Sequence, residues 1–417
     1  MKKFFLFCMM ALVTICGLNS CSDDCDHVLT EHNHSADLVG TWTCRTADFA
    51  EALVIKADGS ALSTGYDGED FWENVAGNIV VENGKISMTF EDGDNWKGHF
   101  DIVPGVAFSI FTDKGDYLTF NYCKEDLSDE IIGMWVANNG PMGYENDMVI
   151  QTFKEDGYTI KTGWSDGAND FIVNNTTNYK VVGDLVFFKR PSDMVTEEIT
   201  PYVASKLIYT PNGTSLGDIL TVTGYIPSDK GLVEVTGNFL RIKQHLELPG
   251  MKYDYIKTFV TNVKGLDKDI EFMGTTFNFA KMDGVMMDKA LKAILFNVEF
   301  PDANTIKYNC YYNGQNMSME VPIVVDGNKM TVKMSQKNPA YKDVDLYTFQ
   351  DQDNTQMHMY MHSTGFENFF GNMQVTIMEQ LGQLDTTDAA AVKTVFDSID
   401  EAVETINVSF VMTKAAR

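Results

Sequence analysis

The chain has 417 residues, of which 44% are hydrophobic and 12% aromatic, and this length and apolar content favour about two to four packed domains. Its formal net charge of −27 at pH 7 would repel phosphate backbones, which argues against a nucleic-acid partner. The spacing of the seven cysteines indicates no disulfide framework, so apolar cores are expected to provide most of the stability.

The N-terminus has the three parts of a secretory signal peptide. Lys2 and Lys3 give a basic start, residues 4–18 are nearly all apolar, and a small residue, Ser20, precedes a cysteine. The apolar stretch is too short to form a stable membrane-spanning helix. We therefore predict a cleaved signal peptide over residues 1–20.

The segment Leu18-Asn19-Ser20-Cys21 resembles the lipobox of bacterial lipoproteins. The resemblance implies that Cys21 becomes the mature N-terminus and is acylated with two or more chains such as palmitate. Anchoring becomes durable at that number of chains, so the membrane is an expected partner through the lipid anchor. An ordinary secretory signal that ends at a cysteine by chance is the alternative.

Residues 21–36 are polar and are expected to form a lipidated tether. Within it, Ser22-Asp23-Asp24-Cys25-Asp26 resembles the acidic tag with which some Gram-negative phyla send lipoproteins to the outside face. A solvated acidic linker is the alternative interpretation. The expected location is therefore the outer membrane of a Gram-negative bacterium, with the protein facing outside.

Two repeats follow the tether. Leu38-Val39-Gly40-Thr41-Trp42 opens the first, and Ile131-Ile132-Gly133-Met134-Trp135 opens the second, with the second tryptophan 93 residues after the first. Each opening leads into eight strand-like runs with period-two alternation, joined by hairpin turns such as Asp58-Gly59 and Asp156-Gly157. Eight strands of this kind close into a small barrel, so we predict one barrel over 37–124 and another over 125–246.

The Gly-x-Trp at the start of each repeat resembles the first strand of lipocalins and the wider calycin group. The resemblance implies up-and-down barrels in which the tryptophan closes one end beneath a basic residue of the last strand. Arg241 is placed to do this for Trp135 by a cation–π contact, whereas the first repeat offers only Lys124, past its last strand. Trp42, Trp135 and Arg241 are thus interpreted as structural barrel plugs and not as ligand-binding residues.

The third segment, 250–417, lacks Gly-x-Trp. It contains seven strand-like runs, the first near 293–300, with helices expected near 367–384 and 387–404 and a short one near 285–293. This pattern resembles calycin-like lipoprotein domains of unknown function that carry a helical insertion. The expected fold class is therefore all-β: tandem small antiparallel up-and-down barrels, calycin- or lipocalin-like, the C-terminal one with helical insertions.

A run of methionines marks the predicted strand at 356–362. Met357, Met359 and Met361 share one face, and the other face carries two histidines about 13 Å apart at the rise of a strand. The methionine face has three interpretations: a core of adaptable side chains, a deformable pocket for a lipid, sterol or other hydrophobe, or a thioether site for Cu(I).

Signals for catalysis are weak. Gly163-Trp164-Ser165-Asp166-Gly167 matches the Gly-x-Ser-x-Gly elbow of hydrolases, but that elbow needs a strand-to-helix turn and this one lies between strand-like runs. No other stretch offers a nucleophile, a metal cage or a phosphate loop. We therefore predict that the protein is not an enzyme and has no catalytic residues, no metal site and no cofactor.

The sequence thus favours a surface-tethered lipoprotein whose barrels bind a small hydrophobic or glycan-derived ligand or a partner protein. The main alternative is a structural or adhesive module with filled barrels and no small ligand, and a lesser one is copper binding through methionine and histidine. A barrel interior with a cavity favours ligand binding, and an interior filled by side chains favours the structural alternative.

Overall fold

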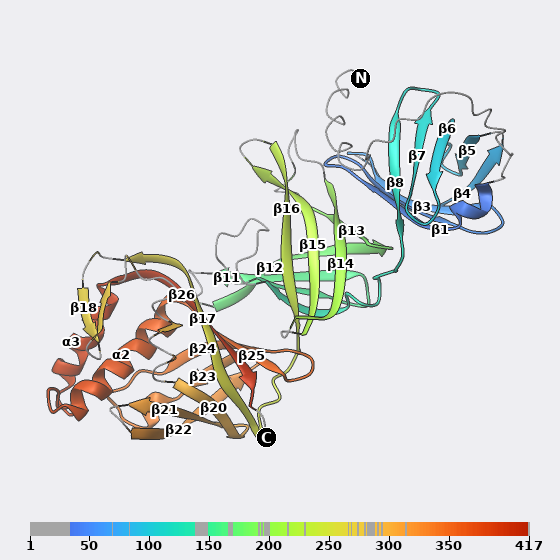
Figure 1. Cartoon of the computed structure of the whole chain (residues 1–417). Coiled ribbons are helices and arrows are strands. Elements are labelled where there is room, and N and C mark those ends of the chain that lie inside the picture. Colours follow the sequence, from blue (N-terminus) through green and yellow to red (C-terminus); the bar gives the residue numbers. More distant parts are fainter. Residues whose placement is uncertain are drawn as a thin grey trace, which may run out of the picture.

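The structure is a computed structural model that describes residues 34–415, apart from 69, 83, 138–148, 166–169, 191, 193–194, 196–200, 215–216, 229–230, 266, 268, 273–274, 279–280, 282–287, 290–291, 293–294 and 313–314. Three closed antiparallel barrels follow one another along the chain (Figure 1). The predicted all-β fold of tandem eight-stranded barrels is therefore confirmed. The signal peptide, Cys21 and most of the tether lie outside the described residues.

Barrel 1 pairs its strands in chain order and closes through β1 and β8. Its strands are β1 (Gly40–Arg45), β2 (Ala50–Ile55), β3 (Ser60–Tyr66), β4 (Phe71–Glu82), β5 (Lys85–Phe90), β6 (Asn95–Val103), β7 (Ala107–Thr112) and β8 (Tyr117–Cys123). Alternation along β5 places Ile86, Met88 and Phe90 in the buried interior. A short 3-10 helix, η1 (His34–Leu38), precedes β1 and buries Leu38 in the same core.

Barrel 2 repeats this plan and closes through β9 and β16. Its strands are β9 (Gly133–Ala137), β10 (Val149–Phe153), β11 (Tyr158–Ser165), β12 (Asp170–Val182), β13 (Leu185–Lys189), β14 (Tyr202–Thr214), β15 (Gly217–Ser228) and β16 (Gly231–Ile242). Several strands of barrel 2 are longer than the corresponding runs in the sequence pattern, notably β12 and β14 with 13 residues each.

Barrel 3 has a first strand that the pattern did not reveal. β17 (Met251–Gly265) pairs with both β20 and β26 and closes the barrel. The other strands are β20 (Leu295–Asp302), β21 (Thr305–Tyr312), β22 (Gln315–Asp326), β23 (Lys329–Val332), β24 (Val344–Gln350), β25 (Gln356–Met361) and β26 (Val403–Lys414), with η4 (Met334–Gln336) after β23. A separate two-stranded sheet, β18 (Asp269–Phe272) and β19 (Thr275–Asn278), follows β17.

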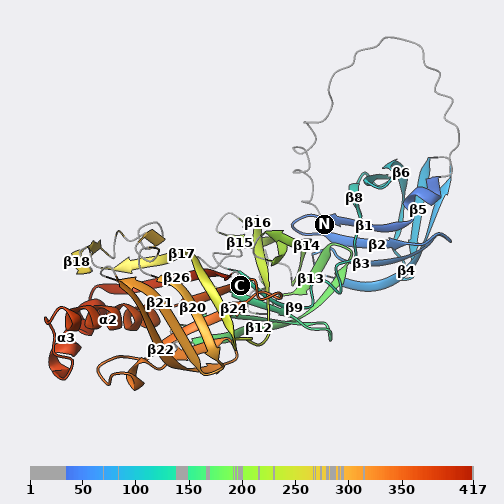
Figure 2. The ribbon, with the colours of Figure 1, turned by 60° about the horizontal axis from the view of Figure 1, so that its bottom comes forward.

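Two helices lie between β25 and β26, as predicted. They are α2 (Ser363–Gln380) and α3 (Ala389–Asp400), and they lie on the side of barrel 3 away from barrel 2 (Figures 1 and 2). Asp388 caps α3, because its carboxylate accepts hydrogen bonds from two backbone amides of the first turn. The short helix expected near 285–293 falls mostly outside the described residues. Among the helices described, none is long and apolar enough to cross a membrane.

Barrels 1 and 2 contact each other through a buried apolar cluster. Its members come from the outer faces of β2, β3, β12, β13 and β14 and are Ala50, Ala52, Tyr66, Val182, Leu185, Phe187 and Ala204. At its edge, Phe71 stacks on Tyr202 with ring centroids 5.1 Å apart, and Glu73 pairs with Lys180 at 2.9 Å. An outward alanine in a small barrel is normally exposed, so burial of these alanines shows that barrel 2 covers that face.

Barrels 2 and 3 are joined in the same way. Their shared buried cluster consists of Val136, Ile150, Ile242, Tyr347, Phe349 and Tyr360. The backbone amide of Lys243 donates to the carbonyl of Gln350 at 2.8 Å beside this cluster. The barrels therefore form a row with barrel 2 in the middle (Figure 2).

Candidate functional site

The tryptophans of the two Gly-x-Trp motifs occupy matching positions in barrels 1 and 2. Trp42 and Trp135 are both 0% exposed. Each indole Nε1–H donates to the carbonyl four residues earlier, Leu38 in barrel 1 and Ile131 in barrel 2, at 2.7 Å in both cases. A buried indole needs a partner for its N–H, and the segment just before the strand supplies it. The two repeats thus place their tryptophans by the same local device.

The glycines of the motifs have a backbone conformation that favours glycine. Gly40 has φ of 138° and Gly133 has φ of 132°. A Cβ on Gly40 would also lie 2.6 Å from Cε2 of Tyr122, whereas the nearest atom to a Cβ on Gly133 would be Nε of Arg241 at 3.6 Å. Glycine is therefore required by backbone conformation in both barrels and by a close neighbour in barrel 1.

Arg241 lies over the Trp135 ring. The two residues are register partners between β16 and β9, and the guanidinium carbon is 5.1 Å from the ring centroid. Its Nη2 donates to the carbonyls of Glu130 at 2.9 Å and Ile132 at 2.7 Å. These contacts place the side chain in the position that the sequence indicated and tie the last strand of barrel 2 to the start of its first strand.

In barrel 1 the corresponding residue is Tyr122. It is the register partner of Trp42 between β8 and β1, and the two rings meet edge to face with centroids 5.0 Å apart. Lys124, the residue that the sequence offered for this role, follows the end of β8. An aromatic side chain thus takes the place that arginine has in barrel 2, and no basic residue of the last strand is needed.

In barrel 2 a carboxylate lies beside Arg241. The Asp218 carboxylate lies 3.5 Å from Nη1 of Arg241 and accepts a hydrogen bond from the Tyr209 hydroxyl at 2.7 Å. The Tyr209 ring in turn meets Trp135 edge to face at 6.4 Å. The charge of Arg241 is therefore compensated within the same end of the barrel.

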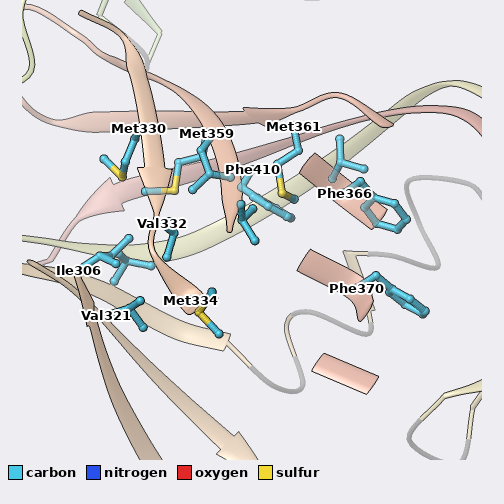
Figure 3. Packing of buried hydrophobic residues seen from close by; sticks show 14 of the residues in the cluster. Ile306, Val321, Met330, Val332, Met334, Met359, Met361, Phe366, Phe370 and Phe410 are labelled. Carbon is cyan, nitrogen blue, oxygen red and sulfur yellow. The ribbon is translucent and has the colours of Figure 1, made fainter. Parts of the chain in front are cut away.

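The methionine face of β25 lies inside barrel 3 (Figure 3). Met357, Met359 and Met361 are 0%, 2% and 0% exposed, in one buried cluster with side chains such as Val332 and Phe410. A ligand at this face would have to displace packed core side chains. The geometry therefore matches the interpretation as a core of adaptable side chains more closely than the interpretation as a pocket.

Of the two histidines in this stretch, only His358 lies on β25, on the face opposite the methionines; the strand ends at Met361, and His362 is the N-cap residue of α2. His358 shares that face with Tyr360, which belongs to the contact between barrels 2 and 3. Burial lowers the pKa of His358 to about 4, and its Nε2 has no hydrogen-bond partner among the described residues. A copper ion could not take thioether and imidazole ligands from this one strand together. In the described part of the chain, no cluster of three or more His, Cys, Asp or Glu side chains is arranged to hold a metal ion.

The serine of the Gly-x-Ser-x-Gly match lies in a β hairpin. Ser165 is the last residue of β11 and pairs with Asp170 at the start of β12. A nucleophile elbow turns from a strand into a helix, and here one strand leads into the next.

A polar side chain inside barrel 1, that of Glu51, was not predicted from the sequence. Glu51 is 2% exposed and points inward from β2 with Leu53, while the flanking alanines point outward to barrel 2. Its Oε1 accepts a hydrogen bond from Ser63 at 2.6 Å, and Ser63 accepts one from Nε1 of Trp72 at 2.7 Å. Its Oε2 has no hydrogen-bond partner among the described residues.

Glu51 lies towards the end of barrel 1 where β1 ends and β2 begins, the end away from Leu38. We call this end the mouth of barrel 1; Phe49, Trp72 and Trp96 are half-buried there. The turns at this end are 46–49, 67–70, 91–94 and 113–116, and their acidic residues include Asp48, Asp67, Asp70, Glu91, Asp92, Asp94, Asp113 and Asp116. Burial raises the pKa of Glu51 to about 7; the hydrogen bond from Ser63 opposes this rise, and the carboxylates of Asp94 and Asp92 add to it.

Comparisons with known proteins give no family for the chain. No protein-family model matches the sequence, and no curated protein matches it. Solved structures that resemble it include a double mutant of the vaccine antigen Transferrin Binding Protein B from Haemophilus parasuis Hp5, intact Ap-TbpB with its N and C lobes, and isotype 1 TbpB from serogroup B Neisseria meningitidis.

The likeness to these structures is distant. Sequence identities are 10%, 10% and 7%, and TM-scores are 0.25, 0.23 and 0.21. Each match covers 88% of this chain and 66% of the other chain, so this chain spans slightly less than two thirds of their length. At such TM-scores the likeness carries no argument, and the barrel architecture rests on the strand pairings of the chain itself.

Proposed function

We propose that this chain is a lipid-anchored protein of a Gram-negative outer membrane that faces outside and binds a partner protein with the surfaces of its three barrels. The observation that carries the proposal is the packing of the barrel interiors. Within the part of the chain that the structure describes, the buried apolar side chains inside each barrel form one cluster. Recognition is therefore assigned to outer faces and barrel ends, and not to an internal cavity.

Exposed apolar side chains support the proposal. Phe111 and Tyr117 are cross-strand neighbours on the outside of barrel 1, and each is 56% exposed. Barrel 2 exposes Ile208 and barrel 3 exposes Val324 to a similar extent. The buried contacts between neighbouring barrels hold the three barrels in one row. A partner protein is the class of ligand that binds an extended outer surface of this kind.

The anchor is the part of the proposal that rests on sequence alone. Cys21 follows a signal-like segment and precedes a polar tether. We expect a Cys21→Ala variant to be released from the membrane fraction, because the acyl chains are lost. Protease treatment of intact cells should digest the wild-type protein; protection of the protein would contradict outward display and leave the anchor standing.

Site-specific photo-crosslinking tests partner binding. A benzoylphenylalanine is placed at Phe111, Ile208 or Val324 on intact cells, in contact with the proteins of the native environment. Partner binding predicts a discrete cross-linked product from at least one position. An excess of the wild-type protein, which lacks benzoylphenylalanine, should reduce the amount of that product. The alternative, a structural module with filled barrels that binds nothing saturably, predicts no competed product at any of the three.

A further inference from the structure

The mouth of barrel 1 has the composition of a cation site. We propose that it binds an organic cation, an ammonium or guanidinium group, which pairs with the Glu51 carboxylate beside the indoles of Trp72 and Trp96. The inference rests on the proposed function, because it names the chemistry that a partner would present to one barrel end. A free polyamine and a basic side chain of a protein share this chemistry.

Glu51 has a buried acceptor, Oε2, that the described residues leave unused. Trp72 donates to Ser63 and Ser63 donates to Oε1, so this chain of hydrogen bonds orients the carboxyl group but leaves Oε2 without a donor in the described structure. A buried acceptor without a donor costs free energy, and the observed one is held in position by neighbours that are themselves satisfied. An N–H of a bound cation would supply the missing donor.

Half-buried aromatic side chains lie around the mouth. Trp96 packs against Phe49 with ring centroids 6.4 Å apart, and both residues are half-buried. Trp72 covers Gly65, where a Cβ would lie 2.6 Å from the indole. Ring faces attract ammonium and guanidinium groups, and they attract them most strongly where water is partly excluded.

The turns around the mouth are rich in carboxylates. β2 and the turn between β5 and β6 lie on opposite sides of the eight-stranded barrel, and the carboxylates of Asp92 and Asp94 in that turn still act on Glu51 across it. Arg45 of barrel 1 points outward to barrel 2, where it pairs with Glu234. The four turns of the mouth hold one basic residue, Lys114, beside the eight acidic residues named above, so the mouth has a net negative charge.

The structure favours an organic cation over a metal ion. The carboxylates near the mouth do not form a group of three or more that would hold a metal, within the described residues. Asp92 instead accepts a hydrogen bond from the backbone amide of Asp94 at 3.0 Å and shapes its own turn. Calcium requires six to eight oxygen ligands, whereas a guanidinium group needs one carboxylate and a ring face.

Calorimetric titration of the mature protein tests the proposal. The probes are spermidine, the capped peptide acetyl-Gly-Arg-Gly-amide and calcium chloride, each in about 0.15 M salt to screen non-specific attraction to the acidic surface. We expect Glu51→Gln to weaken binding of at least one organic cation about ten-fold or more. The matched control is Glu82→Gln, which removes an exposed charge at the opposite end of the barrel and should leave binding unchanged.

The pH dependence gives a second readout. The cation needs the charged carboxylate, and the pKa of Glu51 is raised to about 7. The charged fraction therefore rises from about a tenth at pH 6 to about nine tenths at pH 8, and the apparent Kd should fall about ten-fold over that range. This dependence should disappear in Glu51→Gln, whose thermal unfolding reports whether the variant remains folded.

The relative affinities of the probes show whether the cation comes from a protein or from a free amine. Tighter binding of the peptide assigns the site to a basic side chain of a protein, and tighter binding of spermidine assigns it to a free amine. The proposal is overturned if Glu51→Gln, still folded, binds both probes as the wild type does, or if calcium alone binds in a Glu51-dependent way. Photo-crosslinking of a partner that persists in Glu51→Gln would leave the proposed function standing while this inference fails.

Discussion

Barrels 1 and 2 close the same end in the same way but with different side chains over the tryptophan. Both bury a tryptophan that donates to the carbonyl four residues earlier, and both require glycine two residues before it. Above the ring, barrel 1 has Tyr122 and barrel 2 has Arg241. The Gly-x-Trp motif thus fixes the position of the tryptophan. Which residue lies over the ring depends on whether that end of the barrel has carboxylates and carbonyls that can compensate a positive charge.

The difference follows from the surrounding polar groups. Arg241 finds Asp218 and two backbone carbonyls at its end of barrel 2. Tyr122 brings no charge and contacts Trp42 through its ring edge. An arginine without these acceptors would leave a partly buried charge without a partner, which is costly. Tyr122 and Arg241 are therefore equivalent in position but not interchangeable.

The largest expected effect is the loss of either tryptophan. Trp42→Ala and Trp135→Ala each remove a fully buried indole, and such truncations cost about 3–5 kcal/mol. Hydrogen exchange resolved by barrel should show the loss in the barrel that carries the change, since the three barrels need not unfold together. If one substitution lowered the hydrogen-exchange protection of both barrels by a similar amount, the two tryptophans would not stabilise their barrels independently.

Removal of the residue above the ring should have different consequences in the two barrels. Arg241→Met takes the donor from two carbonyls and the partner from Asp218, and we expect a loss of about 2–3 kcal/mol in barrel 2. Tyr122→Met keeps an apolar contact and leaves no charge unpaired, so the loss should be smaller. Denaturant unfolding of the two variants checks the order, and equal losses would contradict it.

The glycines sharpen the comparison further. Alanine at either position meets a disfavoured φ, which costs about 1–3 kcal/mol. Gly40→Ala also forces its Cβ against Tyr122, whereas Gly133→Ala has room, so the first should be more destabilising. When Tyr122 is also replaced by alanine, Gly40→Ala should lower the free energy of unfolding no more than Gly133→Ala does. If Gly40→Ala still costs more in that background, the clash with Tyr122 is not the cause.

The smallest expected effect is that of the acidic residue in barrel 2. Asp218→Asn keeps an acceptor for the Tyr209 hydroxyl but removes the charge 3.5 Å from Arg241. Because the pair is partly exposed, we expect a loss of about 1 kcal/mol or less, decreasing as salt is added. Urea midpoints measured at low and high salt report it, and a loss as large as that of Arg241→Met would make the ion pair the main feature of the plug.

Period-two alternation was enough to predict barrels 1 and 2, because every second residue of a strand faces a packed apolar interior. It failed for β17, whose pairing with β26 shifts register near Tyr255, Thr261 and Lys264. Each irregularity changes which face a residue occupies, so the alternation breaks although the strand continues. Helices α2 and α3 were both predicted, α3 from its apolar face, with boundaries displaced by a few residues.

The candidate sites were predicted less completely than the fold. Tyr122 was missed because the resemblance pointed to a basic residue, and the register between the first and last strands that identifies it is a tertiary property. Glu51 did leave a signal, since it shares the inward positions of Leu53 and Ile55 along β2. The buried alanines beside it concealed this pattern, because contact with barrel 2 buries the outward face as well.

Native mass spectrometry of the purified mature protein tests most directly the claim that recognition takes place outside filled barrels. The account predicts that no hydrophobic small molecule accompanies the lipidated polypeptide, and that lipid extracts leave its thermal stability unchanged. A hydrophobic molecule that copurifies at one per chain and is released on unfolding would contradict it, because such a molecule would have to occupy an interior that the side chains fill.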